Sequence, residues 1–357
     1  MSRRAATVSL LLLAGLLTGC RTYYGQAIRG QWQLLTAPQS VSSLLAATNT
    51  PPELNRKLDL VLRLRAFAEK QLHLPVNGHY ANYADLGRRF VVWNVYAAPE
   101  FSVEDKTWWY PVVGSLSYRG YFREDLARRY GGRLAREGWD VFVGGVEAFS
   151  TLGWFRDPLL NTFIQHGDTD LAELLFHELA HQRLFLSGDT DFNEAFATAV
   201  AQEGVRRWLR AHGNAADIAA YETASRREEQ FVALVQKTRT ELESLYAKTN
   251  SLSTEALRAG KASAFARFRE DYAALKRAWG GYAGYDGWFN GELNNAKLNT
   301  VDTYHHLVPG FAALLTRCGG DLEVFYREVR GLRRLKKTER HERLLEFTRR
   351  EAGAPTR

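Results

Sequence analysis

The chain has 357 residues, of which 45% are hydrophobic and 24% charged, and it contains 29 Gly and 9 Pro. This is an ordinary globular composition, which excludes a disordered, collagen-like or low-complexity chain. The formal net charge of +7 is too small to indicate nucleic-acid binding, and two cysteines, Cys20 and Cys318, are too few for a disulfide framework.

Residues 1–19 have the pattern of a secretory signal peptide, in which two arginines precede an apolar run. The run of about ten residues is too short to span a bilayer core of about 30 Å. It ends in Leu17-Thr18-Gly19-Cys20, which resembles the lipobox of bacterial lipoproteins. The resemblance implies cleavage before Cys20, acylation of its thiol and attachment to the membrane by lipid, and Arg21 implies the outer membrane, facing the periplasm. The alternative is a simple signal peptide with a chance cysteine.

The mature chain, residues 20–357, is predicted to form one α+β unit. Residues 20–202 carry a small mixed sheet and residues 203–357 are helical. Periodicity predicts a helix over 52–72, strands over 90–97, 107–113, 117–122 and 140–143, and a helix over 123–137. Gly144 and Gly145 are expected to end the fourth strand, and the chain beyond residue 170 is expected to be almost wholly helical.

The segment that carries chemistry is His177-Glu178-Leu179-Ala180-His181, which lies between apolar residues of a predicted helix. Asp170 and Glu173 are expected to form a capping box at its start, and Ser187-Gly188 to end it. On a helix, residues four apart lie on one face, so both imidazoles can bind one zinc ion. Glu178 lies beside them, where it can accept a proton from water activated by the metal.

A catalytic zinc site needs a third protein ligand. The next acidic candidates are Asp189, Asp191 and Glu194, the last of which lies on the next predicted helix. Glu194 is preferred, because Asp191 is expected to be the N-cap of that helix. A helix that ends near Leu186 and reverses would place Glu194 opposite His177 and His181.

This motif, followed by Asn193-Glu194 on the next helix, resembles the gluzincin metallopeptidases. Further segments resemble a bacterial lipoprotein family of predicted zinc aminopeptidases; they are Tyr23–Ala27, Tyr118–Phe122, Ser150–Phe155 with Asp157-Pro158, and Asn294–Ala296. The resemblance implies that His177, His181 and Glu194 are zinc ligands and Glu178 is the base. Thr198 stands where an aspartate often orients a ligand histidine, so no residue is assigned to that role.

Several further residues are candidates with open alternatives. The resemblance to the clan implies a tyrosine or histidine as the donor to the oxyanion, so Tyr304 is the candidate, with His305 or His306 as replacements, and a core tyrosine is the other interpretation. The same resemblance implies that Ser150–Phe155 binds the substrate backbone by β-addition, and plain core is the alternative. The glycine-rich exopeptidase signature is absent, and Glu147 is the candidate for a contact to a free amine.

Two helical regions have other possible roles. Residues 228–248 and 254–279 are predicted to form an antiparallel hairpin with an internal apolar seam, a partner groove being the alternative. Residues 327–350 contain ten Lys or Arg and four Glu. This basic segment is expected to be a solvated helix, and contact with anionic lipid is the alternative. The residues expected to pack inward are Leu332, Leu335, Leu344, Leu345 and Phe347.

These observations predict a zinc-dependent peptide hydrolase, anchored by lipid in the bacterial envelope, that acts on peptides or proteins. The alternative function is a non-catalytic zinc-containing lipoprotein that serves as a scaffold or binds a partner. An intact Glu178 favours the enzyme, because a structural zinc site needs no base.

Overall fold

The computed structural model describes residues 38–110, 114–148 and 156–352, with the side chains of 302–305 and 351–352 outside the described part. The elements of the first part are β1 (Gln39–Ser40), α2 (Val41–Ala46), α3 (Pro52–Gln71), β2 (Asn82–Ala84), β3 (Val92–Pro99), β4 (Trp108–Tyr110), β5 (Gly114–Leu116), β6 (Arg119–Tyr121), α4 (Glu124–Arg136), β7 (Trp139–Val146) and β8 (Leu159–Leu160). The remainder is helical, with α5 (Asp168–Arg183), α6 (Thr190–His212), α7 (Ala215–Tyr246), α8 (Thr254–Ala278), α9 (Asp286–Phe289), α10 (Asn295–His305), α11 (Val308–Arg317), α12 (Leu322–Leu332) and α13 (Lys337–Ala352). The α+β class predicted from the sequence is confirmed.

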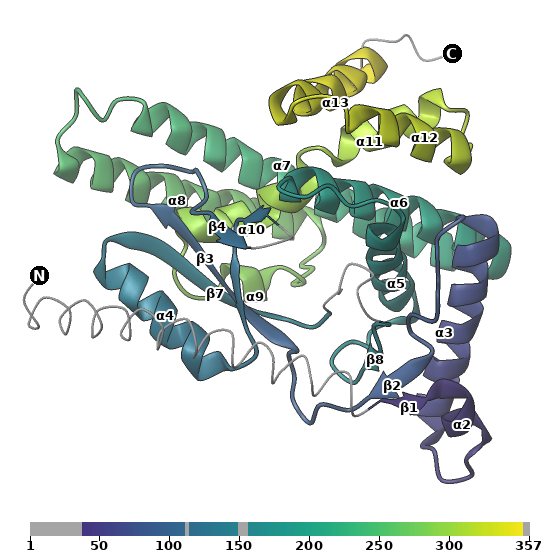
Figure 1. Ribbon diagram of the computed structural model, residues 1–357. Helices are drawn as coiled ribbons and strands as arrows, with labels where there is room; N and C mark the ends of the chain where they lie inside the picture. Colours follow the sequence, from purple (N-terminus) through teal and green to yellow (C-terminus); the bar gives the residue numbers. More distant parts are fainter. Residues whose placement is uncertain (1–37, 111–113, 149–155, 353–357) are drawn as a thin grey trace, which may run out of the picture.

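The two longest strands, β3 and β7, pair in an antiparallel sheet whose strand order is β6-β3-β7. Its side chains alternate between two faces, as a pleated sheet requires. Val95 and Ala97 pack toward α4, whereas Tyr96 and Ala98 pack against Ala296 at the start of α10. The sheet is therefore covered by a helix on each face (Figure 1).

The strand predictions need correction. Strand β7 continues through Gly144 and Gly145, which pair with Asn94 and Trp93 of β3, so the glycines do not end the strand. A Cβ atom on Gly145 would lie 2.4 Å from the ring of Phe90, so glycine is needed there to let that ring pack. The strand predicted over 117–122 spans only 119–121, and β1, β2, β5 and β8 were not predicted.

Three helices, α11, α12 and α13, lie above α6, and α5 lies below it (Figure 1). Together with α3 they enclose the largest apolar core. Leu332, Leu344 and Phe347 are buried in this core, and Leu335 and Leu345 are partly buried against it, which confirms the inward face predicted for the basic segment. Cys318 packs on the edge of the same core, and burial raises the pKa of its thiol.

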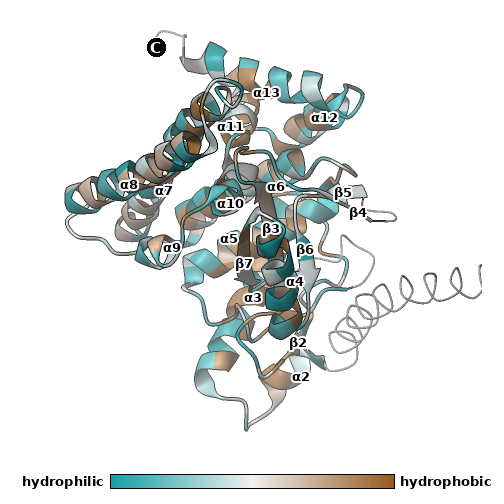
Figure 2. Ribbon diagram, turned by 90° about the vertical axis from the view of Figure 1, so that its left-hand side faces the viewer, coloured by the Kyte–Doolittle hydropathy of each residue, from teal (hydrophilic) through white to brown (hydrophobic). Residues whose placement is uncertain are grey.

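The α7–α8 hairpin extends from the body of the molecule as an arm in which apolar and hydrophilic residues alternate (Figure 2). Its internal seam contains Phe231, Leu242, Phe265 and Phe268, all buried, which confirms the predicted intramolecular packing. The loop after α8 contains the short helix α9, which was not predicted. None of the helices in the described ranges is both long enough and apolar enough to cross a membrane.

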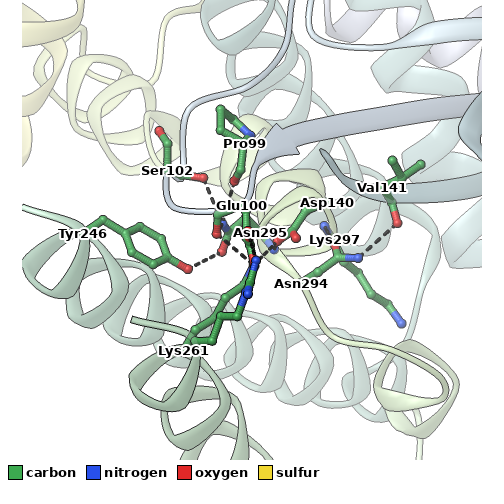
Figure 3. A network of polar contacts seen from close by, with 11 residues as sticks. Pro99, Glu100, Ser102, Asp140, Val141, Tyr246, Lys261, Asn294, Asn295 and Lys297 are labelled. Atoms are coloured by element: carbon green, nitrogen blue, oxygen red, sulfur yellow. Dashed lines mark hydrogen bonds and ion pairs between the residues drawn. The ribbon is translucent and has the colours of Figure 1, made fainter. Parts of the chain in front are cut away.

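Asn295 joins the arm to the sheet (Figure 3). Its side-chain amide lies 3.0 Å from the carbonyl oxygens of Pro99 and Ser102, and its amide oxygen accepts a hydrogen bond of 3.0 Å from Tyr246. Its backbone N–H donates to Asp140 at 2.8 Å. Because Asn295 is fully buried, these bonds fix the start of α10 against both β3 and α7.

Candidate metal centre

Helix α5 places His177 and His181 on one face. It begins at Asp168, whose carboxylate contacts Arg56 and Lys57 at 2.7 Å each. A hydrogen bond from Arg56 lowers the pKa of Asp168 to about 2, so the charge is retained at the helix N-terminus, where it is favourable. The predicted capping box at Asp170 is therefore wrong: the N-cap is Gly167 and makes no side-chain cap, and the helix ends at Arg183, before the predicted stop.

The turn between α5 and α6 sets the third candidate ligand opposite the histidines. Asp189, and not Asp191 as predicted, is the N-cap of α6, and its side chain accepts a hydrogen bond from the backbone N–H of Phe192. Asn193 closes the turn, because its side chain bonds both the N–H and the carbonyl oxygen of Leu186 at 2.8 Å. Asn193 is buried, so the residue before Glu194 is held firmly.

The three candidate ligand atoms lie at close and similar distances. Nε2 of His177 lies 3.2 Å from Oε2 of Glu194 and 3.2 Å from Nε2 of His181, and the remaining pair is 3.6 Å apart. Around a tetrahedral zinc ion with bonds of about 2.0–2.1 Å, ligand atoms are about 3.3–3.4 Å apart. The three residues therefore fit zinc, and two imidazoles with one carboxylate are a donor set typical of catalytic sites.

The electrostatics of the three residues also suit a cation. Burial alone would raise the pKa of Glu194, but His181 and His177 lower it below its ordinary value, so the carboxylate is ionised. An ionised carboxylate beside two imidazole nitrogens is the state that binds a metal.

Glu178 follows His177 directly in the same helix and is partly exposed. Its Oε2 atom is buried and has no hydrogen-bond partner among the described residues. Burial raises the pKa of Glu178, an effect that the charges of His177 and His181 oppose. A carboxylate oxygen that is buried without a donor is suited to take up a proton.

His177 and His181 differ in what lies beside Nδ1, the ring nitrogen that is not the candidate ligand atom. Thr198 Oγ1 lies 3.5 Å from Nδ1 of His177, so a threonine of α6 occupies the place for which no residue had been assigned. Nδ1 of His181 is buried, without a hydrogen-bond partner in the described part of the chain. No hydrogen bond within the described part of the chain therefore fixes the His181 ring from its Nδ1 side.

Among the other residues predicted to be functional, only His306 and Glu147 have side chains in the described part of the chain. Cys20 and Ser150–Phe155 lie outside the described residues, and so do the side chains of Tyr304 and His305, although their backbone belongs to α10. His306 is described, and its ring centroid lies 6.0 Å from that of His341. Glu147 contacts His166 at 2.8 Å, an arrangement that the sequence did not indicate.

Tyr80 and Asp157 are buried and interact electrostatically with Glu178, and the sequence analysis assigned no role to either of them. Tyr80 is buried with a backbone φ of +57°, and burial together with the charges of Glu178 and Asp157 raises the pKa of its hydroxyl. The backbone N–H of Asp157 donates to Nδ1 of His79 at 3.1 Å. The only sequence signal was Asp157-Pro158, which had been noted within the family resemblance.

A second group of possible ligand residues consists of Asp189, Asp191 and His341. Arg340 contacts the Asp189 carboxylate at 2.5 Å and 2.9 Å, and Lys337 contacts Asp191 at 3.2 Å. Burial opposes ionisation of Asp189, but His341 and Arg340 lower its pKa. Protein cations already neutralise these carboxylates, so this group does not fit a metal ion.

A protein-family model described as "Putative aminopeptidase" matches residues 22–344 of the chain. The match includes all three candidate ligands and Glu178. No curated protein and no solved structure shows significant similarity to the chain.

Proposed function

The chain belongs to the putative aminopeptidase family, and on that premise we propose that it hydrolyses peptides at a zinc ion held by His177, His181 and Glu194. The observation that carries the proposal is the spacing of the three ligand atoms, 3.2 to 3.6 Å, which suits a tetrahedral zinc ion. The arrangement on two packed helices supports the gluzincin-like assignment.

Zinc, when bound, lowers the pKa of a coordinated water to about 7 and polarises a carbonyl group. Glu178 accepts the proton of the attacking water and passes it to the leaving amine, since its carboxylate lies in the same helix turn as the ligands. Tyr304, or one of its neighbours His305 and His306, donates a hydrogen bond to the developing oxyanion.

We further propose that the chain is a lipoprotein of the bacterial envelope, attached to the outer membrane through acylated Cys20 and facing the periplasm. The proposal is supported by Leu17-Thr18-Gly19-Cys20 after a short apolar run and by Arg21. More than one acyl chain on the cysteine would make attachment stable.

The experiment that separates the enzyme from a zinc-containing scaffold is a peptide-library digest with zinc analysis of the same preparations. The wild type and Glu178→Gln are each assayed after their zinc content has been measured. Cleavage by the wild type that is lost in zinc-loaded Glu178→Gln supports the peptidase. A wild type that holds zinc and cleaves no peptide supports the scaffold.

A further inference from the structure

Asp189 is the most deeply buried carboxylate near the proposed zinc site, with 1% of its surface exposed. It lies in the turn that joins the two ligand-bearing helices, and it caps α6 through the N–H of Phe192. A buried carboxylate is costly unless it is paired, and here its partners come from the opposite end of the chain. They are Arg340 and His341 of α13, about 150 residues away.

All three nitrogen atoms of the Arg340 guanidinium group donate hydrogen bonds, two of them to Asp189. Its Nε and Nη2 atoms donate to Oδ2 of Asp189 at 2.9 and 2.5 Å, and Nη1 donates to the carbonyl oxygen of Leu335 at 2.9 Å. The guanidinium also lies 5.2 Å from the ring centroid of Phe192, and the residue is 5% exposed. His341 contacts the other carboxylate oxygen at 2.8 Å, so both oxygens of Asp189 are held by α13.

Helix α13 is itself firmly placed. It packs on α11 at Gly310, where a Cβ atom would lie 2.5 Å from the carbonyl oxygen of Leu344. Helix α11 in turn packs on α6, with the ring centroids of Phe311 and Phe192 5.1 Å apart. Arg340 and His341 therefore hold the first turn of α6 from a fixed support.

The first turn of α6, which Arg340 and His341 contact through Asp189, lies close to the candidate ligand Glu194. Glu194 follows Asp189 by five residues, or about 7.5 Å along the helix. A zinc site tolerates deviations in its ligand distances of about 0.2 Å. A small displacement of the start of α6 would therefore move Oε2 of Glu194 out of range of the two imidazoles of α5.

We propose that Arg340 and His341 are positioning residues for the metal centre, which act through Asp189 to hold Glu194 in place to bind zinc. The proposal rests on the proposed function, because it concerns the affinity of that site for zinc. It assigns to the basic C-terminal segment a role that neither a solvated helix nor lipid contact would require.

The test measures the zinc affinity of the folded full-length chain by competition with a chelator, at a temperature well below unfolding. Arg340→Met and Asp189→Asn should each weaken zinc binding by about tenfold, the lower end of the loss typical when a supporting partner of a ligand is removed. Asparagine can still cap α6, so Asp189→Asn removes the charge and keeps the cap. Arg340→Lys should restore part of the affinity, because one charged donor remains.

Two control variants separate positioning from stability. Arg343→Met removes a cation of α13 that contacts Glu346 at 2.9 Å and should leave zinc affinity unchanged. Leu242→Ala removes a fully buried side chain from the α7–α8 seam, a different apolar cluster from that of α13, so it should lower the melting temperature without the tenfold loss of affinity. If Arg340→Met does not fold, Asp189→Asn provides the comparison by itself.

Zinc affinity equal to that of the wild type in both Asp189→Asn and Arg340→Met, or in Asp189→Asn alone if Arg340→Met does not fold, would overturn the positioning role and leave the proposed zinc site intact. Loss of affinity in Leu242→Ala as large as in Asp189→Asn would also overturn it, since destabilisation alone would then explain both. A wild type that binds no zinc would overturn the proposed function and this inference together.

Discussion

Nε2 of His177 and Oε2 of Glu194 lie 3.2 Å apart although they belong to different helices. The approach depends on a short turn that Asn193 closes by bonding both backbone polar groups of Leu186. Because the turn is fixed before any ligand binds, little reorganisation is needed to complete a metal site. Preorganisation of this kind favours binding, since less conformational entropy is lost.

The first prediction concerns the metal ligands. His177→Ala, His181→Ala and Glu194→Ala should each reduce bound zinc from about one ion per chain, because a site with three protein ligands loses much of its affinity with any one of them. Asp191→Ala is the control, since Asp191 contacts Lys337 at 3.2 Å. Metal analysis of the purified proteins checks this. Full zinc in Glu194→Ala together with loss in Asp191→Ala would transfer the ligand role to Asp191.

The second prediction concerns the general base. Glu178→Gln should retain the fold and the zinc, because the side chain keeps its shape and is not assigned as a ligand. Turnover of any peptide that the wild type cleaves should fall by at least about a hundredfold, because an amide cannot accept the proton. The measurement is kcat for the two proteins at matched zinc content. Unchanged turnover in the zinc-loaded variant would contradict the mechanism.

The sequence predicted the elements whose signal is local. The helix with His177 and His181 follows from the apolar residues on both sides of the motif, and α3 and α4 follow from apolar periodicity. Strands of two or three residues, such as β1 and β8, are too short to show a period, and they form only because a distant strand pairs with them.

The missed parts of the site share a physical cause. Arg340 and Asp189 are separated by 151 residues, and nothing near either residue indicates that they form a buried pair. The N-cap was misplaced for the same reason, because Asp189 and Asp191 are equivalent by local preference. Tertiary contacts with α13 decide between them, since they bury Asp189 and leave Asp191 partly exposed.

The third prediction concerns the lipid anchor. Cys20→Ala should release the protein from the membrane fraction, because the thiol that would carry the acyl chains is gone. Cys318→Ala is the matched control and should remain with membranes, since Cys318 packs against the core of the folded chain. The two variants are compared by membrane fractionation at high salt. A Cys20→Ala protein that still sediments with membranes would contradict the lipoprotein proposal.

The last prediction concerns the pH dependence of stability and rests on Glu173, one turn before His177 in α5. Burial, together with the charges of Glu228 and Asp170, raises the pKa of Glu173 to about 8. In the unfolded chain its pKa is about 4.5, so below pH 4.5 the carboxyl is protonated in both states and has no effect on stability. As the pH rises toward 8, only the unfolded state ionises readily, and the free energy of unfolding falls.

Glu173→Gln removes this penalty, because an amide stays neutral at every pH. The variant should be more stable than the wild type by about 1–3 kcal/mol at pH 7 to 8, and the difference should vanish near pH 4. Urea unfolding of both proteins across this range measures the effect. Glu222→Gln, at an exposed position of α7, is the matched control and should show no comparable gain. A Glu173→Gln protein with the same stability as the wild type at pH 8 would show that Glu173 is already ionised in the folded chain.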